Sequence, residues 1–340
     1  MEMRHRMDFI NKNLRGILLC LCIAIPAWSL GKMFPIIGGP VLGILFGLII
    51  ATIPRKNYFS SGIAFTSKKI LQYAIVLLGF GMNLFEIFKV GSQSILVIIS
   101  TISTSLIVSY LLSKFMNIPA NVSILVGVGS SICGGSAIAA TAPVINADDE
   151  DIAKSISVIF LFNVIAAFLF PVLGNFLGLN DIGFGMFAGT AINDTSSVVA
   201  AGQTWSNAHG NDVALNYATI VKLTRTLAII PITLVLAIYR SHKEKSSSNK
   251  VSIKKIFPWF VLFFLLASIT STAFNMPSTT FKPLTELGKF FITMAMAAIG
   301  LNTNIVKLIK TGGKPILMGF CCWVSIASVS LMMQKVLGIW

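Results

Sequence analysis

Two polar stretches, rich in glycine and hydroxyl groups, hold most of the residues that could bind a ligand. They are residues 129–143 and 189–202, and each lies inside a segment otherwise apolar enough to cross a membrane. Backbone that departs from a regular helix inside a bilayer has unpaired amide and carbonyl groups, so it is stable only where it lines a protein-enclosed or hydrated cavity. The two stretches therefore indicate a polar binding site within the membrane.

A pair of cations, Lys222 and Arg225, lies in the apolar segment 213–239. At about 1.5 Å per residue, Lys222 is roughly 14 Å from the start of this segment, near the middle of a hydrocarbon core about 30 Å thick. The two side chains share a helix face because they are three residues apart. Ionisable residues at this depth mark functional sites by default, so we expect both cations to attract an anion.

Asp194 is the carboxylate at a comparable depth, and the sequence leaves its role open. It could form a structural ion pair with Lys222 or Arg225. Alternatively, Asp194 with its neighbour Asn193 could couple transport to protons or sodium. Nearby hydroxyls donate hydrogen bonds and glycines let backbone N–H groups approach a ligand, which suits an oxyanion. The substrate-binding residues expected beside the two cations are Ser130, Ser131, Gly134, Gly135, Ser136, Thr195, Ser196 and Ser197.

The composition requires transmembrane helices to position these residues. Of the 340 residues, 55% are hydrophobic and 11% are charged, and the mean hydropathy is +0.84. A transmembrane helix needs about 20 mostly apolar residues. We therefore predict an all-α polytopic membrane protein of about eleven transmembrane helices. The stretches that qualify are 16–34, 36–53, 70–88, 93–113, 121–145, 155–178, 182–203, 213–239, 256–274, 287–305 and 316–338.

Most of the 26 lysines and arginines fall on alternate connections, which the positive-inside rule assigns to the cytoplasm. This distribution predicts a multi-pass protein of the cell membrane with its N-terminus inside and its C-terminus outside. The net charge of +14 therefore reflects the side of the lipid bilayer on which the basic residues lie, and it does not indicate binding to nucleic acid. Six basic residues, with the acidic run 148–151, are expected outside: Lys32, Lys89, Lys154, Lys282, Lys289 and Lys335.

The same pattern predicts how the chain is organised. Residues 1–15 form a cytoplasmic N-terminus, and residues 16–239 hold the first eight helices with both polar stretches. A basic cytoplasmic linker, 240–255, separates them from the last three helices in 256–340. The five cysteines are odd in number and lie in the apolar segments, so a disulfide framework is not expected. No Cys/His spacing fits a zinc site, and we expect neither a metal nor a cofactor.

Internal similarity predicts a transporter core. Residues 81–83 and 87–96 resemble residues 300–302 and 308–317, and the two copies run in opposite directions in the eleven-helix arrangement. Inverted repeats are typical of secondary transporters, which bind substrate at the repeat interface. The two polar stretches also align with each other, either as broken helices that each cross once or as re-entrant hairpins from opposite faces. We favour broken helices, because about 22 residues are short for a hairpin.

The chain resembles a family of bacterial inner-membrane proteins described as sulfate exporters, over nearly its whole length. The matching motifs are 127–134, 189–202, 221–225 and 294–301. The resemblance implies anion export. This sequence departs from the family at Asn193, where the family often has histidine. Residues 81–89, 133–136 and 147–155 resemble the bile acid and sodium symporter group more weakly. That likeness implies inverted five-helix repeats, two crossing broken helices, a separate panel domain and sodium coupling, unless Lys222 and Arg225 replace a bound ion.

The sequence as a whole predicts a secondary active transporter for a small anion, sulfate or sulfonate-like, that works by alternating access around a site in the middle of the membrane. Protons or sodium would drive it, and two copies could associate as a homodimer. An anion channel is the alternative. A less favoured alternative is an intramembrane enzyme with Ser196 and Lys222 as a catalytic dyad. Because we favour a transporter, we expect no catalytic residue.

Overall fold

The structure, a computed structural model, is helical throughout the residues that it describes: 2–34, 38–53, 57–233, 235–236, 259–274, 278–303 and 313–340. The predicted linker 240–255 lies outside these residues, as does the first half of 308–317, residues 308–312, in the second repeat copy. Contacts divide the chain into two compact units, with unit 1 formed by 1–87, 199–216 and 260–304 and unit 2 by 88–198, 217–259 and 305–340.

Unit 1 is built around α15 (Ser278–Asn302), which packs against α1 (Glu2–Met33), α2 (Gly39–Ala51) and α4 (Leu71–Gly79). A 3₁₀ turn (Asn57–Phe59), α3 (Ser60–Phe65) and a π-helical stretch (Thr66–Ile70) precede α4. The helices α14 (Trp259–Ala273) and α10 (Thr195–His209) belong largely to the same unit. Small residues let α2 and α15 approach closely, because a Cβ on Gly47 would lie 2.9 Å from the Cα of Gly300.

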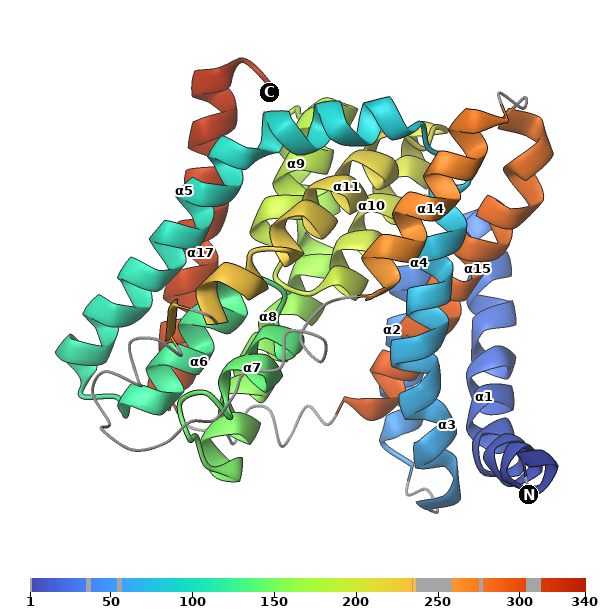
Figure 1. The fold of residues 1–340 in the computed structure, drawn as a ribbon, viewed down its shortest axis with the longest axis horizontal. Coiled ribbons are helices and arrows are strands. Elements are labelled where there is room, and N and C mark those ends of the chain that lie inside the picture. The colour runs from blue at the N-terminus through green and yellow to red at the C-terminus, as the bar shows by residue number, and fades with distance from the viewer. Residues whose placement is uncertain are drawn as a thin grey trace. The chain divides into compact units, whose positions relative to one another are not determined.

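Unit 2 holds the two polar stretches. It contains most of α5 (Leu84–Met116), then α6 (Ala120–Ser131), α7 (Gly135–Thr141), α8 (Asp149–Phe176) and α9 (Asp181–Ala191). Most of α11 (Val213–Thr226) and all of α17 (Gly313–Leu337) complete it (Figure 1). Its core joins apolar side chains of α6, α7, α8 and α17, among them Leu125, Ile138, Ile159 and Met318.

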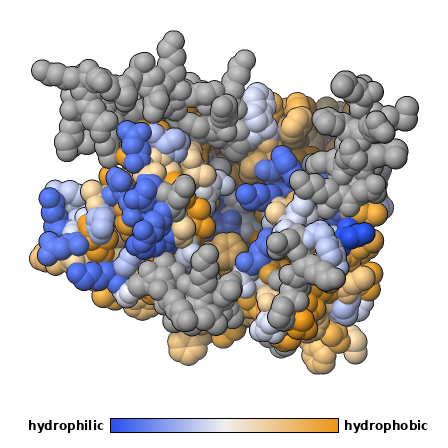
Figure 2. Space-filling view, turned by 90° about the horizontal axis from the view of Figure 1, so that it is seen from below, coloured by the Kyte–Doolittle hydropathy of each residue, from blue (hydrophilic) through white to orange (hydrophobic). Residues whose placement is uncertain are grey.

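The helices have the lengths and surfaces of membrane spans. Within the described residues, six helices are long and apolar enough to cross a membrane, and three apolar helices are shorter. Figure 2 shows apolar residues, in orange, exposed at the surface. Phe115 and Phe176 are among the most exposed of them, which suits contact with lipid. The predicted count of eleven crossings is not confirmed, and the predicted helix 70–88 is wrong in its bounds, because α4 ends at Gly79 and α5 begins at Leu84.

Helices α6 and α8 run in the same direction. At their starts, the side chains of Asn121 and Asp151 hydrogen bond. Eight residues further along each helix, a Cβ on Gly129 would lie 3.1 Å from Ile159. Two parallel helices that follow each other in sequence need a connection that returns to the starting level. The short helix α7 makes this return (Figure 1), and the side chain of Ile138 lies against Gly129.

Residues 121–145 are therefore a re-entrant hairpin, and the preference for a broken helix that crosses once is wrong here. The reversal occurs at 132–134, where Gly134 has a φ of +70° that suits glycine. With only seven residues, α7 is about 10 Å long and too short to complete a crossing. The acidic run 148–151 accordingly lies on the same side as the start of α6, and not on the opposite side as predicted.

Candidate functional site

Both polar stretches interrupt a helix, as the sequence predicted. The first break separates α6 from α7 at 132–134, and the second separates α9 from α10 at 192–194. Each break exposes carbonyl groups at the C-terminal end of one helix and N–H groups at the N-terminal end of the next. Because the described parts of both breaks are fully or largely buried, these groups need partners from the protein.

Lys222 binds carbonyl oxygens from both breaks. Its ammonium donates hydrogen bonds to the carbonyl oxygens of Ile132 at 2.7 Å, Ile192 at 3.1 Å and Asn193 at 2.5 Å. The side chain is fully buried. An ammonium group has three N–H donors, so Lys222 has no further donor for a ligand in this conformation.

Arg225 repeats the arrangement one helical turn further along α11. Its Nε donates to the carbonyl oxygen of Ser131 at 2.7 Å, and its two terminal nitrogens donate to Ser130, also at 2.7 Å, and to Thr190. These carbonyls belong to the last turns of α6 and α9, where the helix dipole favours a cation. Lys222 and Arg225 therefore join two helix ends that would otherwise leave orphan carbonyls in an apolar interior.

Asn163, on α8, holds the second break from another direction. Its Oδ1 accepts hydrogen bonds from the backbone N–H groups of Asn193 at 3.1 Å and Asp194 at 3.2 Å. Its Nδ2 would lie 3.6 Å from a Cβ on Gly134, and so would the Cβ of Asp194. Asn163 is a polar residue inside the apolar segment 155–178, and only the fold shows that it lies beside both breaks.

Asp194 begins α10. Its Oδ2 accepts a hydrogen bond from the hydroxyl of Ser196 and another from the backbone N–H of Ser197 at 3.3 Å, which is the pattern of an N-cap. Among the described residues, no carboxylate lies within ion-pair distance of Lys222 or Arg225. The direct ion pair considered from the sequence is thus wrong, although Lys222 is near enough to act on Asp194 electrostatically.

Buried polar atoms without a partner point to where a ligand could bind. In the described part of the chain, the hydroxyl of Ser130 and both polar atoms of the Asn193 side chain make no hydrogen bond and are shielded from solvent. Such atoms are rare in folded proteins because each costs about 1–3 kcal/mol when left unpaired. Other buried polar atoms of the described residues also lack a partner, among them those of Ser123 and Ser155. Ser130 and Asn193 are the strongest candidates for contact with a ligand or ordered water because they lie at the two breaks.

The remaining predicted residues are not equally placed. The hydroxyl of Ser131 bonds the carbonyl of Val128 in its own helix, and Ser136 is exposed. A Cβ on Gly135 would meet nothing within 4 Å, whereas Thr195, Ser196 and Ser197 are buried. The catalytic dyad of Ser196 and Lys222 is not formed, because the serine bonds Asp194 and the lysine bonds carbonyls.

Comparison with known proteins places this chain in a family of membrane proteins. A family profile described as conserved hypothetical protein 698 matches residues 15–319. UPF0324 membrane protein FN0533 of Fusobacterium nucleatum is 57% identical over 346 residues, which cover 97% of this chain and 100% of that protein. The chain belongs to this family.

Streptococcal members of the family are similar to this chain over nearly the same length. A UPF0324 membrane protein of Streptococcus pyogenes serotype M18 is 58% identical over 335 residues, covering 97% of this chain and 98% of its own. One from Streptococcus mutans is 55% identical over 337 residues with the same coverage. The names of these relatives state a membrane location and no substrate. The membrane assignment is therefore confirmed, and the exporter and symporter resemblances contribute proposals only.

Proposed function

We propose that the protein is a secondary active transporter for a small anion, with its binding site beside the two helix breaks. The charge of the site carries this proposal. Lys222 and Arg225 are both fully buried cations, and Asp194 is the one carboxylate at the breaks among the residues that the structure describes. Each break exposes one C-terminal and one N-terminal helix end, so the dipole charges cancel in sum. One positive charge is left over, and a buried uncompensated charge favours an anion as its partner.

The cations attract the anion through their field, while other groups contact it. Among the buried donors without a partner in the described residues, the hydroxyl of Ser130 and the amide of Asn193 are those beside the two breaks. The positive end of the α10 helix dipole also suits an anion, and it already attracts the carboxylate of Asp194, which accepts from the N–H of Ser197. Sulfate or a small sulfonate has acceptor oxygens for all of these donors. In this proposal Lys222 and Arg225 attract the substrate without touching it, which replaces the expectation from the sequence that they bind it directly.

The same geometry favours protons over sodium as the coupling ion at the breaks. In transporters with broken helices, unwound carbonyls and C-terminal helix ends coordinate a sodium ion. Here the ammonium of Lys222 takes three such carbonyls. Asp194 then serves as the coupling group, because its protonation removes a negative charge from the start of α10. A proton and an anion therefore bind together and move in the same direction.

Transport into proteoliposomes tests the proposal, with sulfate and methanesulfonate as substrates. An inwardly directed proton gradient, with the outside more acidic than the inside, drives uptake. We expect Ser130→Ala and Asn193→Ala each to raise KM about tenfold or more, because each removes a charge-assisted hydrogen bond worth about 1.5–3 kcal/mol. Asp194→Asn should leave anion exchange intact but abolish the stimulation by the pH gradient. Ser100→Ala is the matched control, since this exposed hydroxyl bonds the carbonyl of Leu96 in its own helix.

Other outcomes would contradict the proposal in recognisable ways. Uptake of cations but not anions would reverse the ligand sign. Single-channel currents carried by the anions would support the channel alternative. An unchanged pH response in Asp194→Asn would remove the coupling role without touching anion binding.

A further inference from the structure

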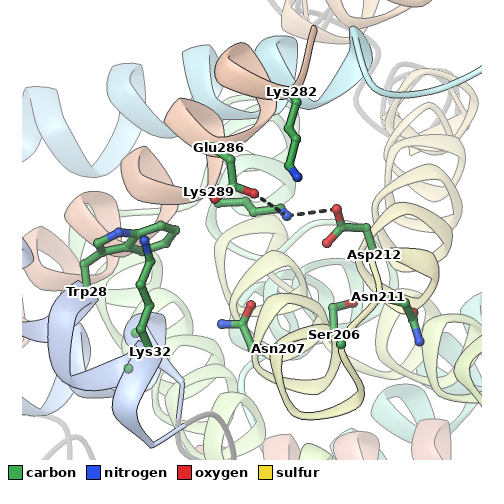
Figure 3. A pocket seen from close by; sticks show the side chains of 12 residues that line it. Trp28, Lys32, Ser206, Asn207, Asn211, Asp212, Lys282, Glu286 and Lys289 are labelled. Carbon is green, nitrogen blue, oxygen red and sulfur yellow. Dashed lines mark hydrogen bonds and ion pairs between the residues drawn. The ribbon is translucent and has the colours of Figure 1, made fainter. Parts of the chain in front are cut away.

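Unit 1 contains a second polar site, a cavity of about 350 Å³. The last turns of α1, the turn between α10 and α11 and the first turns of α15 form its walls (Figure 3). All of its lining residues belong to unit 1, and none of them belongs to the helix breaks. The volume is that of a site for a small molecule. We refer to it as the unit 1 pocket.

Helix α15 supplies charged residues on one face of the pocket. Lys282, Glu286 and Lys289 are spaced by four and three residues, which places them on the same side of a helix. Lys289 is largely buried and forms ion pairs with Asp212 at 2.8 Å and Glu286 at 2.9 Å. Each carboxylate gives one oxygen to Lys289, and 48% of the Asp212 side chain and 43% of the Glu286 side chain remain accessible.

The turn that carries Asp212 is fixed by its own hydrogen bonds. Gly210 has a φ of +70°, which ends α10 in the left-handed conformation that suits glycine. The side chain of Asn211 accepts from the N–H of Val213 at 3.0 Å, and the hydroxyl of Ser206 accepts from Leu215 at 3.1 Å. The carboxylate of Asp212 is thus held in place before any ligand binds, which lowers the entropic cost of binding.

The opposite wall carries positive charge over an aromatic ring. The ammonium of Lys32 lies 4.9 Å from the centre of the Trp28 ring, close enough for a cation–π contact. In Figure 3 the ammonium of Lys282 is directed towards Lys289 and its two carboxylates, and Asn207 lies between this group and Lys32. The pocket therefore presents accessible carboxylates on one side and an exposed ammonium, Lys32, on the other.

We propose that the unit 1 pocket binds a small zwitterion, with one ammonium and one acid group separated by a short linker, of the amino-acid class. A simple anion would meet the accessible carboxylates of Asp212 and Glu286, and a simple cation would meet three lysines. A zwitterion satisfies both sides, with its ammonium at the carboxylates and its acid group at Lys32 and Asn207. This proposal does not depend on anion transport at the helix breaks.

The lysines of the pocket come from two distant parts of the chain. Lys32 lies at the end of α1, whereas Lys282 and Lys289 lie in the first turns of α15, so two connections far apart in the sequence meet here. Their meeting in one cavity is consistent with those connections lying on one side of the membrane. No motif in the sequence indicated that these lysines would form a site.

Thermal unfolding of the purified full-length protein tests the proposal. Glycine, β-alanine and γ-aminobutyrate vary the spacing between charges, while acetate and ethylammonium carry a single charge. We expect one of the three zwitterions to raise the unfolding temperature in a saturable way, because a ligand that binds only the folded state stabilises it by mass action. The single-charge ions at the same concentration should shift it much less. Binding should also change the fluorescence of Trp28, and Trp28→Phe should lose that change.

Variants separate this site from others. Lys32→Gln leaves the ion pairs of Lys289 with Asp212 and Glu286 intact. It should weaken zwitterion binding about tenfold or more, because one charge-assisted contact is lost. Lys335→Gln removes an equal charge from the exposed end of α17 and should have no effect. Ser130→Ala, at the helix breaks, should also leave zwitterion binding unchanged. Equal shifts by acetate and glycine, no shift with any zwitterion, or full binding in Lys32→Gln would overturn the proposal.

Discussion

Replacing Lys222 by alanine removes the one ammonium that bonds both helix breaks, and the structure sets the size of the effect. Three charge-assisted hydrogen bonds are lost, each worth about 1.5–3 kcal/mol. Part of this is offset because the buried ammonium no longer loses its hydration, which costs several kcal/mol. We expect a net loss of about 3–5 kcal/mol, as for other buried charges that lose a partner, and a fall in the unfolding temperature of at least about 5 °C.

Chemical rescue distinguishes the lost cation from a simple loss of packing. Alanine leaves space where the ammonium lay, so methylammonium should bind the three freed carbonyls and stabilise Lys222→Ala by about 1.4 kcal/mol at ten times its Kd. Sodium should stabilise the variant as well, although it has no effect on the unchanged protein. The measurement is the unfolding temperature in detergent at constant ionic strength, with choline as the control ion because it has no N–H donor.

Lys222→Met is the matched variant. Methionine is similar in length and fills the space, so this variant should be destabilised but not rescued by methylammonium or sodium. The reasoning would be refuted if Lys222→Ala were as stable as the unchanged protein. It would equally be refuted if choline, or Lys222→Met with methylammonium, gave the same rescue.

Three further predictions concern the helix breaks and their supports. Gly189→Leu should destabilise the protein by about 1–3 kcal/mol through overpacking, because its Cβ would lie 2.7 Å from a side chain of α11; Gly135→Ala, where nothing lies within 4 Å, should be neutral in the same melting assay. Asn163→Ala should lower the unfolding temperature, since two buried N–H donors lose their acceptor at about 1–3 kcal/mol each. If 121–145 is a hairpin, cysteines in place of Asn121 and Asp151 should form a disulfide under mild oxidation, which changes the mobility of the protein on a non-reducing gel. A double variant that migrates like the single Asn121→Cys protein would argue against the hairpin.

The sequence predicted the parts of the site that depend on local composition. Gly134 and the pair Asn193–Asp194 interrupt apolar segments, and residues of these types favour helix ends over helix interiors. Lys222 and Arg225 were recognisable because a cation in an apolar helix needs a buried partner. The partners themselves were not predictable. Backbone carbonyls exist at every position, so no residue type announces that Lys222 would bond Ile132, Ile192 and Asn193.

The sequence also did not predict the direction in which each polar stretch runs through the protein. A stretch such as 121–145 can cross a bilayer once or return to the side from which it started, and its length was a poor guide. Packing of α6 alongside α8 decided in favour of the return, because the hydrogen bond of Asn121 with Asp151 joins the two helix starts. Side-chain contacts of this kind depend on residues distant in sequence, and hydrophobic periodicity carries no information about them.

The sequence by itself determined that this is a helical membrane protein with two helix breaks and two buried cations, because burial of apolar surface and the cost of unpaired backbone groups act on each segment separately. Only the tertiary structure decided what those cations bind, which polar atoms are left for a ligand, and that Lys32 and Asp212 meet the charged face of α15 in the unit 1 pocket. Those outcomes depend on how the helices pack against one another, since packing brings together donors and acceptors that lie far apart along the chain.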